Sequence, residues 1–178
     1  VRGATRRLLD EVDVISAVSG GTLPATFYAL RREKAFEEFE REVLSRNLES
    51  ELAWRIFSPG NWVRLPSGTF GKSDLFTELY DETVFHGAAF GDLQRAGGPY
   101  VVVQATDVTT GAHFPFTQDQ FDLICADLSK VTLGRAVATS TALPPLLTPI
   151  TLENRAGNCG YAEPAWMSAA ADAASRSE

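Results

Sequence analysis

Ser19 is the residue whose type and setting are best suited to covalent chemistry. It stands in the stretch VDVISAVSGGT, where an apolar run leads into small residues. A serine on a sharp turn between a strand and a helix is the nucleophile of many hydrolases. The residues two before and two after it must be small because neighbouring side chains crowd the turn, and Ala17 and Gly21 meet this condition. The match to the pattern G-x-S-x-G departs at one position, where Ala17 replaces the first glycine.

Two interpretations of this turn are open. In the first, Ser19 is a nucleophile, and the backbone N–H of Gly20, helped by the start of the following helix, stabilises the oxyanion. In the second, the small residues only form a turn at the end of a strand. The short motif alone is weak evidence for the first, and its position between an apolar run and a helical pattern strengthens it without separating the two.

A general base for Ser19 is harder to find in this chain. The sequence has two histidines, His86 and His113. His86 precedes Gly87 at an expected helix end, where a histidine favours the helix dipole without any catalytic role. His113 falls in a short alternating stretch and is interpreted as structural. A Ser-His-Asp triad usually carries its histidine late, and no histidine follows Thr117. We therefore do not expect a triad within this chain.

The elements that would position the turn follow from hydrophobic periodicity. We expect a strand over 12–18 that is buried on both faces of a parallel sheet, and a helix over 20–32 directly after it. A second strand over 99–107 leads into a β-hairpin, and a helix over 133–141 ends before Pro144 and Pro145. A further strand is expected over 147–152. Strands separated by helices predict a layered α/β domain with a mainly parallel sheet.

The region between the first two strands is predicted to be helical with one long loop. Charged residues and a spaced apolar face predict one long amphipathic helix over 32–57. Pro and Gly residues then indicate a loop, and Ser73 or Asp74 is expected to cap a helix over 75–85. Apolar residues of the loop, Trp62, Leu65 and Phe70, either line an acyl pocket or cover the core.

Composition limits the class of protein. Of 178 residues, 44% are hydrophobic and 22% charged, which is typical of one globular domain. The net charge of −7 argues against nucleic acid as a partner, because phosphate binding needs a basic surface. No run reaches the roughly 18 apolar residues of a membrane span. Cys125 and Cys159 are too few and too far apart for a disulfide framework and lack metal-ligand spacing, so we expect two buried or incidental thiols.

Three stretches together carry a family resemblance, which extends from about residue 10 to 166. They read DVISAVSGGT, VVVQATDVTTGAHFPFT and RAVATSTALPPLLTPITL. They resemble, in order, the serine elbow, the N-A-T-D-like strand and hairpin, and the A-S-x-A-x-P segment of the patatin-like phospholipase family, particularly its bacterial members. The resemblance implies a three-layer α/β/α sandwich with a mainly parallel sheet. It also implies a Ser-Asp dyad in which Ser19 corresponds to the family's serine.

Two catalytic parts of the family have no counterpart in the sequence. The family's glycine-rich oxyanion loop precedes the elbow, and its dyad aspartate lies in a D-G-G or D-G-A motif, whereas this chain contains no Asp-Gly pair. The resemblance therefore implies that residues 1–178 are a partial domain, incomplete at both ends and inactive alone, with the dyad aspartate outside the chain. The acids that follow, Glu153, Glu163 and Asp172, lack that context. Asp107 is a weak dyad candidate, since its place in the family pattern indicates support of the hairpin turn.

The function implied is hydrolysis of lipid acyl esters, of the phospholipase or lipase type. The acyl-transfer mechanism that the resemblance implies needs no metal and no cofactor. A lipid ester is the expected substrate and a membrane surface a further candidate partner, with a cytoplasmic or membrane-associated location. Two alternatives are an α/β-hydrolase esterase whose histidine lies outside the chain, and an inactive module that binds lipid or a partner. An anion site at the Ser-Gly-Gly-Thr helix start ranks below these because it lacks the lysine of a P-loop.

Overall fold

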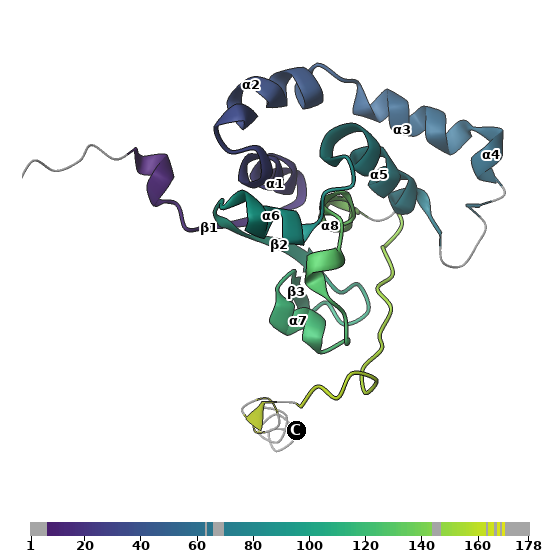
Figure 1. Cartoon of the computed structure of the whole chain (residues 1–178). Coiled ribbons are helices and arrows are strands. Elements are labelled where there is room, and N and C mark those ends of the chain that lie inside the picture. Colours follow the sequence, from purple (N-terminus) through teal and green to yellow (C-terminus); the bar gives the residue numbers. More distant parts are fainter. Residues whose placement is uncertain are drawn as a thin grey trace, which may run out of the picture.

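The computed structural model describes residues 7–62, 64–65, 70–143, 147–162, 164–165, 167 and 169 (Figure 1). Its sheet has three strands in the order β1-β2-β3. Strand β1 (Val14–Val18) runs parallel to β2 (Tyr100–Thr106), with Val14 opposite Tyr100 and Val18 opposite Gln104. Strand β3 (His113–Pro115) pairs antiparallel to β2 and completes the expected hairpin. The sheet is thus mixed, because the hairpin adds one antiparallel pair to the parallel one.

Helices contact one face of this sheet. The buried β2 residues Val101, Val103 and Ala105 share a core with residues of α1 (Thr22–Arg31), α6 (Phe90–Ala96) and α8 (Leu133–Thr141). On the opposite face, Val14 is 58% exposed and Val18 62%. The expectation that β1 is buried on both faces is therefore wrong in the part of the chain that the structure describes. Within that part the domain has two layers, and the third layer of an α/β/α sandwich stays a prediction.

The long helix expected over 32–57 is divided into shorter pieces. The order is η3 (Arg32–Lys34), α2 (Ala35–Phe39), the π-helical turn η4 (Glu40–Leu44) and α3 (Leu48–Phe57). The break has a local cause, because the side chain of Asn47 accepts a hydrogen bond from the N–H of Ser50 and starts a new helix. The prediction of a single helix was wrong, although its apolar spacing was correctly identified as helical.

The expected loop after residue 57 also contains a helical turn, α4 (Pro59–Trp62). Helix α5 (Lys72–Tyr80) then begins three residues before the expected start, with the Asp74 carboxylate accepting from the N–H of Gly71 at 2.8 Å, and it continues into the π-helical turn η5 (Asp81–Phe85). Trp62 is 60% exposed, and the Arg64 guanidinium lies 4.1 Å from the centre of the Phe70 ring.

The helix predicted over 133–141 is confirmed as α8, whereas the strand predicted over 147–152 is wrong. That segment has no strand pairing, and side chains bind its backbone carbonyls instead. The Ser73 hydroxyl donates to the carbonyl of Thr148, and Arg135 donates to the carbonyl of Thr151 at 2.8 Å. Because these carbonyls are already hydrogen-bonded, the segment is held against the helices without joining the sheet.

An aromatic cluster joins the hairpin to the helices. It is made of Phe114, Phe116, Phe121 and Phe90, with Phe116 at its centre. The Phe116 ring lies 5.2 Å from that of Phe121 and 6.1 Å from that of Phe90. The cluster thus fixes β3 to the core.

The remaining helical elements are short. Helix α7 (Gln118–Asp122) and the 3-10 turn η6 (Leu128–Lys130) follow the hairpin, and the 3-10 turn η1 (Leu8–Glu11) precedes β1.

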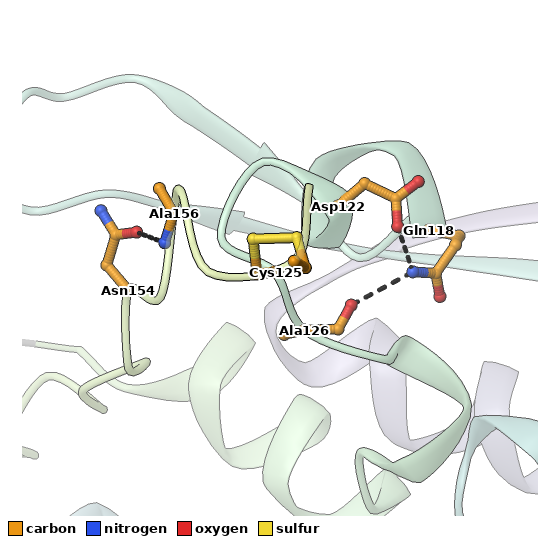
Figure 2. The surroundings of a disulfide bond; sticks show 7 residues. Gln118, Asp122, Cys125, Ala126, Asn154 and Ala156 are labelled. Atoms are coloured by element: carbon orange, nitrogen blue, oxygen red, sulfur yellow. Dashed lines mark hydrogen bonds between the residues drawn. A yellow bond between two sulfur atoms is a disulfide. The ribbon is translucent and has the colours of Figure 1, made fainter. Parts of the chain in front are cut away.

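The two cysteines form a disulfide, which corrects the expectation of separate thiols. Cys125 follows α7, and its Cα lies 5.6 Å from that of Cys159 (Figure 2). Their separation of 34 residues is overcome because the chain returns beside the end of α7, where the N–H of Arg155 donates to the carbonyl of Ile124. The Gln118 amide braces the same loop by donating to Asp122 and to the carbonyl of Ala126.

Removing this disulfide is expected to destabilise the domain. In the Cys125→Ser/Cys159→Ser double variant, the free energy of unfolding should fall by about 3 kcal/mol. The reason is that the bond joins residues 34 apart and so lowers the conformational entropy of the unfolded chain. Urea unfolding without reductant measures the difference. Adding dithiothreitol to the unchanged protein should reproduce the loss, whereas the double variant should not respond. Free thiols in the unreduced protein, found by thiol titration, would contradict the assignment.

Candidate active site: the serine turn

Ser19 has the strained backbone that a nucleophile elbow requires. Its φ is +53°, a left-handed conformation that residues other than glycine rarely adopt. The residue lies between the end of β1 and the start of α1, within the 3-10 turn η2 (Ser19–Gly21), and it is exposed. A strand, a strained serine and a helix therefore follow one another without an intervening loop.

Hydrogen bonds hold the backbone of Ser19 on both sides. Its N–H donates to the hydroxyl of Ser140 at 2.8 Å, and its carbonyl accepts from the hydroxyl of Thr22 at 2.5 Å. The Ser140 hydroxyl donates in turn to the carbonyl of Gln104 at 2.6 Å. Thr22 is fully buried, and Thr26 donates to its carbonyl one turn later. The turn is therefore attached both to the first turn of α1 and, through α8, to β2.

The space around the turn differs from the expectation. A Cβ placed on Gly20 or on Gly21 would meet nothing within 4 Å. Crowding therefore does not require a small residue at Gly21 among the described residues, whereas Ala17 is half-buried in β1. The first turn of α1 contains no acidic residue, so the partial positive charge of its N-terminus is not offset there. This arrangement suits an oxyanion next to Gly20.

Asp107 is engaged in the turn that leads to the hairpin. Its carboxylate accepts from the N–H of Thr109 at 2.7 Å and from that of Thr110 at 3.3 Å. These hydrogen bonds to the charged form hold the pKa of Asp107 below its usual range, with the N–H of Thr109 as the largest cause. A lower pKa makes the carboxylate a weaker base, so this geometry suits a structural role in the turn.

The histidines also have structural partners. The Nε2 of His113 donates to the side-chain carbonyl of Gln104, whose amide donates to the hydroxyl of Ser16 at 2.8 Å. His86 ends η5 with a φ of +52°, and its Nδ1 donates to the carbonyl of Glu82. The hydrogen bonds of Ser19 within the described residues run to Ser140 and Thr22, so there the structure pairs Ser19 with neither histidine and with neither Asp107 nor Glu153. Glu163 and Asp172 lie outside the described residues.

A cavity of about 370 Å³ opens at the carboxyl end of β2. Its walls include Ala105 and Thr106 from β2, Thr139 from α8 and the segment from Ile150 to Leu152. Ala105 in the cavity wall directly follows Gln104, whose carbonyl accepts a hydrogen bond from Ser140. Ligands of α/β proteins commonly bind at the carboxyl ends of parallel strands, and this cavity lies at that edge. Its wall combines apolar residues with threonines, Asp107 and Asn154, which suits a substrate with both apolar and polar parts.

The part of the chain that the structure describes also limits two other kinds of site. No cluster of three or more His, Cys, Asp or Glu side chains there could hold a metal ion. None of the helices in that part of the chain is long and apolar enough to cross a bilayer.

The turn at Ser19 carries a strained serine between a parallel strand and a helix. This geometry makes it a candidate nucleophile elbow of the kind found in serine hydrolases. The family model of patatin-like phospholipases matches residues 2–170, and the chain belongs to that family. Members of this family are generally lipid acyl hydrolases that act on lipid substrates. Searches of curated proteins and of solved structures gave no match.

Sequence reasoning missed Ser140. The stretch that contains it resembles a family motif, but that resemblance gives Ser140 no role. A hydroxyl near the carboxyl end of a helix, preceded by small residues that let the helix approach the sheet, is a weak local signal. Only the fold brings it to Ser19, across 121 residues of sequence.

Proposed function

We propose that the protein hydrolyses lipid acyl esters with Ser19 as nucleophile. The observation that carries the proposal is the φ of +53° at Ser19, at a strand-to-helix turn in a chain of the patatin-like phospholipase family. Non-glycine residues keep such a conformation only where the surrounding structure enforces it, and enforced strain is concentrated at functional sites. The exposed position of Ser19 leaves it accessible to an ester.

The proposed reaction is a two-step acyl transfer. The Oγ of Ser19 attacks the ester carbonyl carbon while a base takes its proton, and the N–H of Gly20 stabilises the negative charge on the carbonyl oxygen. The C–O bond to the alcohol then breaks, and the alcohol leaves with the proton that the base had taken. Water attacks the acyl-enzyme in the second step, which releases the fatty acid and restores the Ser19 hydroxyl.

We propose further that the base is an aspartate supplied from outside residues 1–178. Asp107 is poorly suited to act as this base, because backbone N–H groups donate to its carboxylate and lower its pKa. His113 is hydrogen-bonded to Gln104 and His86 to a backbone carbonyl, which leaves both with structural partners. The cavity at the end of β2 is proposed to receive part of the lipid ester, since both apolar and polar residues line it.

A fluorophosphonate probe tests this function directly. The full-length protein should form one phosphonyl adduct, which peptide mass spectrometry should locate on Ser19, and labelling should stop p-nitrophenyl butyrate hydrolysis in proportion. An adduct on a different serine, or ester hydrolysis that survives complete labelling of Ser19, would refute the assignment. Absence of both labelling and hydrolysis would favour the alternative of an inactive lipid- or partner-binding module.

A further inference from the structure

We infer that Ser140 is a positioning residue for Ser19, holding the serine turn against β2 through its hydroxyl. The inference rests on the proposed function of Ser19 and assigns a second residue to the same reaction. Ser140 does not carry out the chemistry. It acts on the backbone of Ser19, to which its hydroxyl is bound at 2.8 Å.

The two hydrogen bonds of Ser140 have a fixed direction. A backbone carbonyl can only accept, so the hydroxyl proton must go to the oxygen of Gln104. A backbone N–H can only donate, so the hydroxyl oxygen must accept from Ser19. The Ser140 hydroxyl thus donates one hydrogen bond and accepts another, and neither can be reversed. It is therefore held in one orientation. It connects Gln104, the last β2 residue paired with β1, to Ser19, which directly follows Val18, the last paired residue of β1.

This connection has a consequence for the oxyanion. The N–H of Ser19 is directed to Ser140, so it is not directed to the substrate carbonyl. The N–H of Gly20 is then the donor that the turn can offer, and its direction depends on the conformation of the peptide before it. Loss of the Ser140 hydroxyl would therefore allow Ser19 to leave its strained φ. It would also change the direction of the N–H of Gly20, the oxyanion donor.

Helix α8 gives Ser140 a rigid support. The preceding turn of that helix places Ala136, Val137 and Ala138 in the core, each fully buried. Closer to its start, the N–H of Gly134 donates to the carboxylate of Asp81, and a Cβ on Gly134 would lie 2.3 Å from that carboxylate oxygen. The helix is thus packed too closely to shift easily, and a group attached to it can hold a strained turn.

Thr141 offers a matched control on the same helix. Its hydroxyl donates to carbonyls of its own helix, those of Val137 and Ala138, rather than to another element. Ser140→Ala removes the connection between the serine turn and β2, whereas Thr141→Val removes a hydroxyl that takes no part in that connection. Ser140→Thr retains the hydroxyl and serves as the conservative rescue.

The experiment measures p-nitrophenyl butyrate hydrolysis and fluorophosphonate labelling with the full-length protein. Ser140→Ala should lower kcat on the order of 10- to 100-fold, because small displacements of reacting groups have effects of that size, with KM changed less than about twofold. The rate of Ser19 labelling should fall by the same factor. Ser140→Thr should recover most of the loss, and Thr141→Val should behave as the unchanged protein.

Amide hydrogen exchange gives a readout that does not need activity. The N–H of Ser19 should lose protection in Ser140→Ala and keep it in Thr141→Val. If the unchanged protein has no Ser19-dependent esterase activity, the proposed function fails, and retained or lost protection of that N–H still decides whether Ser140 holds the turn. If the protein is active and Ser140→Ala keeps its kcat within about twofold, or loses activity only in step with Thr141→Val, the inference about Ser140 fails and the function stands.

Discussion

Replacing Ser19 with alanine is expected to lower kcat/KM for ester hydrolysis in the full-length protein by at least about 10⁴-fold, because the nucleophile is lost. The melting temperature should stay within about 2 °C of the unchanged protein. Alanine keeps the Cβ of serine, so the left-handed φ of +53° is no more strained than before. The hydrogen bonds that hold the turn involve the backbone N–H and carbonyl of Ser19, which the substitution leaves in place. Initial rates with p-nitrophenyl butyrate and a phospholipid, together with thermal unfolding, measure both effects.

Ser19→Gly separates the chemistry of this residue from its backbone strain. Glycine takes a positive φ without a Cβ penalty, so this variant should be equally inactive but at least as stable as Ser19→Ala. Activity in either variant above about 1% of the unchanged rate would exclude Ser19 as the nucleophile. A Ser19→Ala protein that is inactive only because it unfolds would be recognised by its melting curve.

The serine turn could be predicted from the sequence because its signals are local. The apolar residues of β1, the small residues around Ser19 and the helical pattern of α1 lie within about 20 residues, and neighbours in sequence determine a turn of this kind. The hairpin and α8 were predictable for the same reason. The family motifs added the class of chemistry, which spacing and periodicity leave open.

Features that depend on distant partners could not be predicted in this way. Ser140 lies 121 residues from Ser19, and nothing local distinguishes its hydroxyl from those of its threonine neighbours. Cys125 and Cys159 meet only because the chain returns beside α7. The segment over 147–152 has apolar residues suited to a strand, but a strand also needs a neighbouring edge, and side chains bind its carbonyls first.

The largest effect on stability is expected at Phe116, which is fully buried in the aromatic cluster. Phe116→Ala should lower the free energy of unfolding by about 3 to 5 kcal/mol, through lost burial and the cavity left between the rings of Phe121 and Phe90. That loss approaches the whole stability of many domains, which is about 5 to 15 kcal/mol. Urea unfolding followed by circular dichroism measures the change.

Phe36→Ala is the matched control, because Phe36 is 66% exposed and its ring lies 5.9 Å from that of Tyr28, which is only partly buried. The same deletion of a phenyl ring should cost less than about 1 kcal/mol at this position, as is usual for surface substitutions. The N–H of Phe116 donates to the carbonyl of Val103, a backbone hydrogen bond that neither substitution removes, so the comparison isolates the side chain. Equal losses in the two variants would show that the hairpin is not packed into the core. A loss confined to Phe116→Ala would establish that the aromatic cluster fixes β3 beside β2, and with it the edge of the sheet where Gln104 accepts the Ser140 hydroxyl.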